Sequence, residues 1–263
     1  MKIKQIYILL VICGLISSCN KSNDKKSINT VDKQSNTQNE APPPSKYTGG
    51  WPVNYQSNNI QDPGYNLPCP GGTGCECSSN ADCDNQNCNA HPKGNFCVPK
   101  KGDLMPRFNA VDQFGENVDL YDFANQGKMI LIELSTSWCN PCNDFASWLT
   151  TNDQKIKEYQ WWKDRYLPIR NMIESGEIYL INIMSQGTDG TQSISTPEDV
   201  AVWYKKYPNP NVPILADEYK FMYGWIKPTA FPCIFLVDEN MRLINYTNRG
   251  LIDAFLYLTK SGE

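Results

Sequence analysis

The sequence predicts an α/β domain, with a central mixed sheet flanked by helices, preceded by a small disulfide-rich module and a disordered tether. From residue 100 to 263, continuous apolar segments alternate with amphipathic ones, as buried strands alternate with the helices that cover them. Residues 67–99 concentrate six cysteines among small polar residues. The region before them is polar and almost without apolar periodicity.

Residues 1–18 have the composition of an export signal. Two lysines precede an uncharged apolar stretch from Ile6 to Ile16, which is too short for an ordinary transmembrane helix. The stretch ends in five residues that resemble the bacterial lipobox, Leu15-Ile16-Ser17-Ser18-Cys19. This resemblance implies cleavage before Cys19 and a lipid anchor on it, and therefore a place in the bacterial cell envelope, facing the periplasm, or on the cell surface. The alternatives are an ordinary cleaved signal or an uncleaved anchor, with Cys19 as a bystander.

The residue after the lipobox bears on which membrane is used. An Asp directly after the lipidated cysteine would signal retention in the inner membrane of a Gram-negative host. This chain has Asn20 there, which implies the outer membrane. Residues 1–18 contain two of the 24 basic residues and none of the 28 acidic ones, so the mature chain has 22 basic residues and a net charge of −6. This balance does not indicate nucleic-acid binding.

Residues 19–66 are expected to form a flexible linker. They are rich in Asn, Ser, Lys, Gln and Pro, and they cannot offset the entropy of ordering by burying apolar surface. Three aromatic residues near the end of the linker, Trp51, Tyr55 and Tyr65, either dock on the folded domain or stay in a mobile arm.

The module over residues 67–99 is too short and polar to fold by burial alone. Its six cysteines are Cys69, Cys75, Cys77, Cys83, Cys88 and Cys97. Three disulfides would stabilise it by about 2–4 kcal/mol each, and an exported location permits them. The sequence does not choose among the possible pairings. The alternatives are a binding knot for a partner or a metal cluster that uses His91, although an oxidising compartment disfavours free thiolates.

The α/β domain is expected over residues 100–263. Met129–Leu134 is a continuous apolar run typical of a buried central strand, and Asn140–Leu149 follows as a helix. Residues 153–174 extend the helical region, with a break or kink at Pro168. Ile178–Met184 is predicted as a second buried strand.

The C-terminal part of the domain carries clear boundary signals. Thr196 is a favourable cap for a helix that runs to about Lys206, with Pro197 in its first turn. Cys233–Val237 and Arg242–Tyr246 flank a turn sequence and predict an antiparallel hairpin. Leu251–Lys260 is expected as the closing helix.

The most informative motif stands between the first strand and its helix, Trp138-Cys139-Asn140-Pro141-Cys142. Two cysteines at this spacing can close a disulfide and still leave the first sulfur exposed at the helix N-terminus, where the helix dipole favours thiolate. A structural staple or half of a metal site is the alternative. This domain lacks a second Cys/His pair, so the pattern favours thiol–disulfide exchange without a metal or another cofactor.

Three landmarks over residues 102–263 resemble thioredoxin-like proteins of the redoxin and TlpA/ResA type. Gly102–Phe108, followed by Asp112–Gly115, is similar to the redoxin entry hairpin. The Cys139/Cys142 motif is similar to the active-site motif, and Phe231–Asp238 to the segment that carries the cis-proline. The resemblance implies a thioredoxin-like fold with an N-terminal extension and a central insertion. It also favours a reductant over an oxidant.

The resemblance assigns roles within the motif. Cys139 would be the nucleophile that attacks a substrate disulfide, and Cys142 the shielded resolving thiol that releases the mixed intermediate. Pro141 would stiffen the first turn of the helix. Trp138 would cover the disulfide, or it is an ordinary packing aromatic.

Glu133 lies six residues before Cys139, where thioredoxins hold a buried acid that exchanges protons with the resolving cysteine. Burial would raise its pKa into the range of a usable acid and base. The alternative places Glu133 on an exposed strand edge.

The resemblance also implies that Pro232 is cis and that the backbone of Phe231 is free to pair with an extended substrate. Phe231 departs from the Thr or Val usual at its position, which puts the substrate preference in doubt. Cys233 begins a predicted buried strand, so a reduced core thiol is favoured over a third redox centre.

The expected partners are exported proteins with cysteines, an upstream thiol–disulfide electron donor, and the membrane through the N-terminal lipid. Two other functions remain open. A peroxiredoxin-like peroxidase shares the entry segment and has Thr136 three residues before Cys139, but Ile132 stands where peroxidase motifs carry a proline. A surface-anchored binding module would use the cysteine-rich knot and keep the α/β fold as a scaffold.

Overall fold

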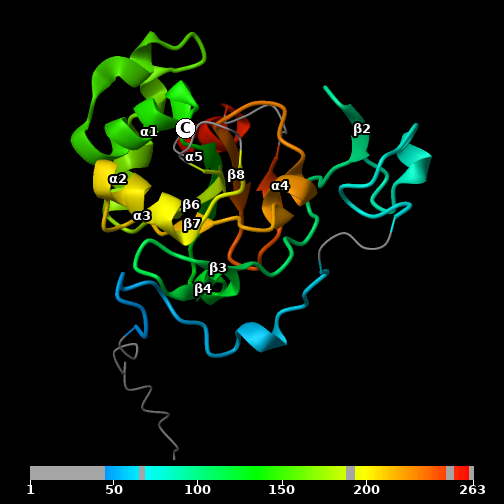
Figure 1. The fold of residues 1–263 in the computed structure, drawn as a ribbon, viewed down its shortest axis with the longest axis horizontal. Coiled ribbons are helices and arrows are strands. Elements are labelled where there is room, and N and C mark those ends of the chain that lie inside the picture. The colour runs from blue at the N-terminus through cyan, green and yellow to red at the C-terminus, as the bar shows by residue number, and fades with distance from the viewer. Residues whose placement is uncertain (1–44, 65–68, 188–192, 247–251, 261–263) are drawn as a thin grey trace, which may run out of the picture. The chain divides into compact units, whose positions relative to one another are not determined.

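The computed structural model describes residues 45–64, 69–187, 193–246 and 252–260, shown in Figure 1. The predicted signal, Cys19, Asn20, Tyr65 and most of the predicted linker lie outside these residues. Within the described residues, no helix is long and apolar enough to span a bilayer.

A five-stranded sheet forms the centre of the α/β domain, in the order β7-β6-β5-β8-β9. The strands are β5 (Ile130–Thr136), β6 (Tyr179–Gln186), β7 (Ile214–Ala216), β8 (Cys233–Val237) and β9 (Leu243–Asn245). Strand β5 pairs in parallel with β6 and antiparallel with β8, so the sheet is mixed. All seven residues of β5 are buried. A central strand covered on both faces explains why this segment is apolar without alternation.

Helices cover both faces of the sheet (Figure 1). They are α1 (Asn140–Thr151), α2 (Pro168–Glu174), α3 (Pro197–Lys206), α4 (Phe221–Ile226) and α5 (Ile252–Lys260). On one face, α1, α2 and α5 pack around Leu131. On the other face, α4 packs in the cluster that contains Ile130 and Ile132. Strand β5 therefore sends alternate side chains into two separate cores.

This architecture confirms the predicted mixed sheet flanked by helices, and the fold is thioredoxin-like. A short antiparallel hairpin, β3 (Asn109–Val111) with β4 (Asn117–Asp119), precedes β5 as the redoxin resemblance implied. The predicted bounds of β5, α1, β6, α3, β8, β9 and α5 agree with the structure within two residues. Thr196 caps α3 through a reciprocal capping box with Asp199.

Two parts of the domain differ from the expectation. Residues 153–174 hold two short 3₁₀ helices, η4 (Gln154–Glu158) and η5 (Asp164–Tyr166), and Pro168 begins α2 instead of interrupting a longer helix. Proline is tolerated at a first helical position because its missing N–H has no partner there in any case. The short elements β7 and α4 were not predicted, because three apolar residues and a six-residue helix containing Gly224 carry no periodic signal.

Residues 45–64 pack on the α/β domain, whereas the sequence predicted a flexible linker up to residue 66. Tyr47 and Trp51 are buried, and Tyr55 is 70% exposed. The Trp51 indole N–H donates to Asp112 Oδ2 at 2.9 Å. The sequence left the docking of Trp51 open because its partner, Asp112, is sixty-one residues away in the chain.

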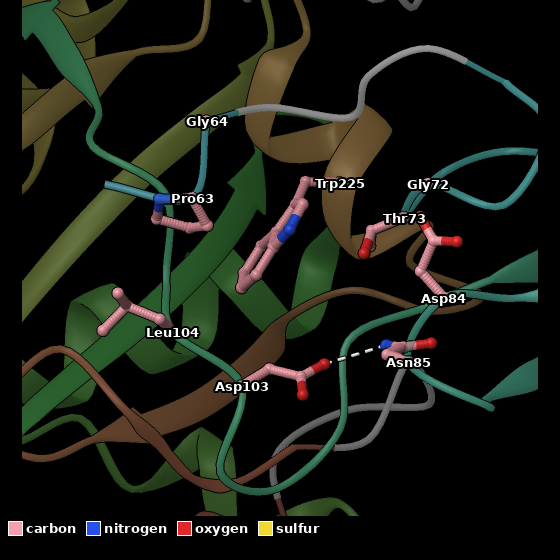
Figure 2. Close-up of a pocket in the computed structure, with 9 residues that line it drawn as sticks. All are labelled: Pro63, Gly64, Gly72, Thr73, Asp84, Asn85, Asp103, Leu104 and Trp225. Carbon is pink, nitrogen blue, oxygen red and sulfur yellow. Dashed lines mark hydrogen bonds between the residues drawn. The ribbon is translucent and has the colours of Figure 1, made fainter. Parts of the chain in front are cut away.

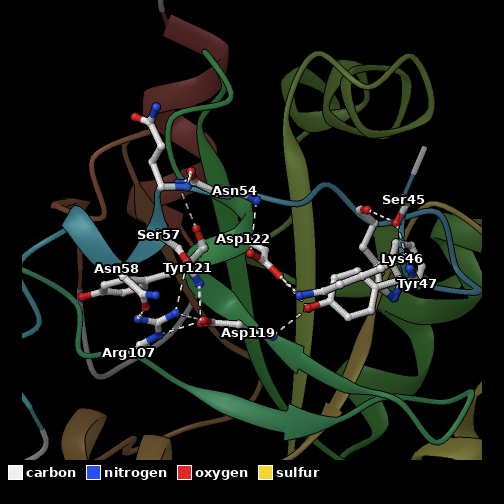
Figure 3. A network of polar contacts seen from close by, with 12 residues as sticks. Ser45, Lys46, Tyr47, Asn54, Ser57, Asn58, Arg107, Asp119, Tyr121 and Asp122 are labelled. Atoms are coloured by element: carbon white, nitrogen blue, oxygen red, sulfur yellow. Dashed lines mark hydrogen bonds and ion pairs between the residues drawn. The ribbon is translucent and has the colours of Figure 1, made fainter. Parts of the chain in front are cut away.

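Polar contacts around Asp122 hold this N-terminal arm, as Figure 3 shows. The Tyr47 hydroxyl donates to Asp122 Oδ2 at 2.6 Å, and the Asn54 backbone N–H donates to Asp122 Oδ1 at 3.1 Å. Lys46 adds an ion pair to the same carboxylate. Nearby, the Arg107 guanidinium binds Asp119 and donates to Asn58 of the arm. A buried carboxylate with three partners is satisfied only when the arm is in place.

The cysteine-rich module contains an antiparallel hairpin, β1 (Cys88–His91) with β2 (Gly94–Cys97). The structure pairs its cysteines as Cys69–Cys75, Cys77–Cys88 and Cys83–Cys97. The sulfur atoms of Cys77, Cys83 and Cys88 lie within 4.8 Å of one another. Each is bonded to another sulfur, so none of them is a thiolate that could bind a metal.

The module meets the arm and the α/β domain around a cavity of about 330 Å³ (Figure 2). Pro63 of the arm, Thr73 and Asp84 of the module and Trp225 of α4 line it. Beside it, the Asn85 amide donates to Asp103 Oδ2 at 2.8 Å. This contact ties the module to the start of the domain.

We expect Trp51→Ala to lower the free energy of unfolding by about 3 kcal/mol, because it removes a buried indole and leaves Asp112 Oδ2 without the indole donor. Urea denaturation measures this change. Trypsin should then cleave after Lys46 in the folded variant but not in the wild-type chain. Tyr55→Ala, which changes an exposed aromatic of the same arm, should stay within about 0.5 kcal/mol of wild type. Equal effects of the two variants would show that the arm is not docked through Trp51.

Candidate redox site

The site forms where β5 ends and α1 begins. Cys139 is the N-cap of α1, a helix of 12 residues, and Pro141 stands in its first turn. The Cys142 backbone N–H donates to Cys139 Sγ at 3.1 Å, and the two sulfurs are joined in a disulfide. A thiolate on Cys139 would therefore gain from both the helix dipole and a direct N–H donor.

The two cysteines differ in access. Cys139 is 4% exposed and Cys142 is fully buried. A groove of about 610 Å³ is lined by Cys139, Asn140 and Pro141 but not by Cys142. The sequence predicted an exposed first sulfur. In the structure Cys139 is largely covered, yet it is the residue of the pair that lines the groove.

Two aromatic rings stand beside Cys139. Trp138 is 43% exposed, and its ring meets the Phe231 ring edge to face, with centroids 5.9 Å apart. The Trp138 indole N–H donates to Gln186 Oε1 at 2.6 Å. The peptide bond between Phe231 and Pro232 is cis. Both rings and Gln186 line the groove. Gln186, at the end of β6, carries no signal in the sequence, because its partner is set by strand pairing and not by spacing.

Glu133 is buried in the middle of the sheet, with strands paired on both sides of it. The alternative of an exposed strand edge is therefore wrong. The Asn182 side-chain amide donates to Glu133 Oε2 at 2.7 Å, and the Ser135 hydroxyl donates to Asn182 Oδ1 at 2.9 Å. The other carboxyl oxygen of Glu133 has no hydrogen-bond partner among the described residues.

Burial raises the pKa of the Glu133 carboxyl to about 8, and the Asn182 amide opposes part of this rise by stabilising the charged form. Asn182 gave no signal in the sequence, because it becomes a partner only when β6 pairs with β5 in register. The unpartnered oxygen and the raised pKa describe a group that is poised to exchange a proton.

A small cavity of about 20 Å³ lies against Glu133, Asn182 and Ala146. Ala146 stands one turn after Cys142 on the same face of α1. The cavity therefore lies against the turn of α1 that follows Cys142, and its volume is sufficient for one water molecule.

Cys233 is a buried thiol at the start of β8, opposite Leu134. Desolvation raises its pKa to about 12, so the neutral thiol is the stable form at physiological pH. This environment is that of the reduced core residue that the sequence favoured.

No family model matches the chain, and none of the curated proteins matches it. The solved structures that resemble it include the following three. The thioredoxin domain of a thiol-disulfide oxidoreductase from Bacteroides vulgatus is 20% identical, with a TM-score of 0.41, over 63% of this chain and 98% of that one. An exposed lipoprotein thioredoxin from Streptococcus pneumoniae is 22% identical, with a TM-score of 0.40, over 59% and 98% of the two chains. A thiol:disulfide interchange protein from a Bacteroides species is 19% identical, with a TM-score of 0.41, over 61% and 89%.

We expect Glu133→Gln to remove a pH dependence of stability in the oxidised protein. A folded pKa of about 8 against an ordinary 4.5 means that the folded state binds the proton more tightly. Wild-type stability should therefore be fullest below pH 4.5 and fall until about pH 8. Above pH 8, the variant should exceed wild type by roughly 2–4 kcal/mol, an order-of-magnitude figure.

Urea denaturation between pH 7 and 9 measures this difference and lies above most of the titration of Asp217, a second buried acid whose pKa is raised to about 6. Glu158→Gln, at an exposed glutamate, serves as the control. A wild-type curve parallel to that of Glu133→Gln would mean that Glu133 does not titrate in this range.

Proposed function

We propose that this protein is a membrane-anchored, exported thiol–disulfide oxidoreductase that reduces protein disulfides through Cys139 and Cys142. One observation carries the proposal: Cys139, the N-cap of α1, lines a groove, whereas Cys142 is fully buried and does not line it. This asymmetry matches the division of labour between an attacking and a resolving thiol.

In the reduced protein, the Cys139 thiolate attacks one sulfur of a substrate disulfide. A new bond joins Cys139 to the substrate, and the other substrate sulfur leaves as a thiolate that takes up a proton. The Cys142 thiol then loses its proton and attacks Cys139 Sγ, which releases the second substrate thiol. Two electrons pass to the substrate, and the protein is left with the Cys139–Cys142 disulfide.

Glu133 is proposed as the group that takes the proton from Cys142. A pKa of about 8 lets this carboxyl accept and return a proton near neutral pH. A water molecule in the cavity beside Glu133 and Ala146 would carry the proton between carboxyl and thiol. Reduction of the resulting disulfide by an upstream thiol donor would complete the cycle.

The envelope location is part of the proposal. The three disulfides of the cysteine-rich module support it, because such bonds persist in exported proteins and are rare in the cytosol. The proposed anchor is a lipid on Cys19, and Asn20 supports the outer membrane in a Gram-negative host.

The peroxidase alternative gains no support from the site. Thr136, on which it depended, is fully buried at the end of β5 and is not among the residues that line the groove.

Replacing Cys142 with Ser should trap the mixed disulfide, because the resolving thiol that breaks it is absent. In the native host, acid quenching and non-reducing electrophoresis should reveal exported proteins linked to Cys139. In a deletion strain, these partners should accumulate disulfides if the protein is a reductase. Cys139→Ser is the matched control. If its adducts equal those of Cys142→Ser, exchange through Cys139 is excluded, and a binding module becomes the better explanation.

Replacing Cys19 with Ala should abolish incorporation of radiolabelled palmitate and move the protein out of the membrane fraction. Cys13→Ala, which changes a cysteine of the same apolar stretch, should keep the label. Absence of label from the wild-type chain would exclude the lipid anchor and leave an ordinary signal or an uncleaved anchor.

A further inference from the structure

The cysteine-rich module reaches the redox site. Three residues at the tip of its hairpin, His91, Pro92 and Lys93, line the same groove as Cys139. In sequence these residues stand almost fifty positions before the cysteine pair. The module is therefore one wall of the groove and not only a spacer before the α/β domain.

Disulfides hold the hairpin rigid. At its base, Cys88 of β1 lies opposite Cys97 of β2 in the strand register. Cys88 forms a disulfide with Cys77, and Cys97 forms one with Cys83. At its tip the strands close through a two-residue turn, where Gly94 has φ +134°, a backbone conformation that favours glycine. A wall fixed in this way would lose little conformational entropy when a substrate binds.

The hairpin is docked on the loop that leads from α4 to Phe231. The Lys227 ammonium lies 4.4 Å from the centroid of the Phe96 ring of β2. His91 of the hairpin and Pro228 of the loop both line the groove. Because this short loop continues into Phe231 and Pro232, the position of the hairpin is coupled to the part of the site that faces Cys139.

The walls of the groove differ in chemistry. Trp138 and Phe231 supply aromatic surface, whereas the hairpin supplies the exposed ammonium of Lys93. Burial lowers the pKa of His91, the backbone of Pro228 opposes part of this shift, and the charges of Lys227 and Lys93 add to it, so the neutral imidazole is favoured. Among the residues that the structure describes, none of those lining the groove is acidic. Lys93 makes no ion pair with the residues that the structure describes.

We propose that the hairpin selects substrates: the groove takes an extended segment of an exported protein in which an acidic side chain lies close to the reactive cysteine and meets Lys93. An apolar or aromatic substrate residue would pack on Trp138 and Phe231. This inference rests on the proposed exchange through Cys139, and it adds the substrate class that the exchange prefers.

The test uses short disulfide-linked peptide dimers, blocked at both ends, that differ only in the residue beside the cysteine: Glu, Gln or Lys. The reduced protein attacks each in stopped flow, and each rate is divided by the rate with hydroxyethyl disulfide, which is small and uncharged. The Glu peptide should react about two- to fivefold faster than the Gln peptide at low salt, the range of an exposed ion pair. The preference should fade at high salt.

Lys93→Gln should abolish the preference for Glu, and Lys93→Glu should reverse it in favour of the Lys peptide. The change should appear in the ratios of the three peptide rates, whereas a misfolded variant would slow all three peptides equally. Lys163→Glu makes the same change of charge at an exposed lysine that does not line the groove, and it should behave as wild type.

The outcomes separate the two proposals. Wild-type protein that reduces all three peptides equally, or a reversal by Lys163→Glu as large as that by Lys93→Glu, would overturn substrate selection by the hairpin and leave the exchange function standing. Wild-type protein that reacts neither with the peptides nor with hydroxyethyl disulfide would overturn both.

Discussion

The pairing of β5 with a parallel neighbour on one side and an antiparallel neighbour on the other is the constraint on which the site depends. Because β8 is antiparallel to β5, the C-terminal end of β5 and the N-terminal end of β8 lie side by side, with Leu134 opposite Cys233. The cysteine motif, which follows β5, therefore lies next to Phe231 and Pro232, which precede β8. This register brings the Trp138 and Phe231 rings together beside Cys139.

The same central position makes burial of the Glu133 carboxyl energetically unfavourable. A carboxyl in the middle of a buried strand loses its hydration, and the Asn182 amide replaces only part of it. The sheet tolerates this group in its neutral form, which is why its pKa rises. Structural stability alone would favour an apolar residue at this position, since apolar residues fill the rest of β5 apart from its polar C-terminal end. The proposed proton transfer gives a reason for an acid at this position.

The segments before the α/β domain are parts of its architecture. The arm at residues 45–64 binds Asp122 through Tyr47 and buries Trp51. The tip of the hairpin in the cysteine-rich module lines the groove. The arm is held by buried polar contacts and aromatic burial, whereas the module is held internally by disulfides. Both segments are too short and polar to form a hydrophobic core, so each is stabilised by these other interactions.

Local sequence was enough to predict the elements that have a strong periodic or boundary signal. The buried run of β5, the cysteine pair at the start of α1, the cap at Thr196 and the β8–β9 hairpin all depend on neighbours a few residues apart. The sequence also singled out Glu133 and Phe231 by their places relative to the motif. Asn182, Gln186, the docking of Trp51 and the approach of Lys93 to Cys139 were decided by the tertiary structure alone. Each of these depends on a partner dozens of residues away, and only strand register and packing, which local sequence does not encode, bring such partners together.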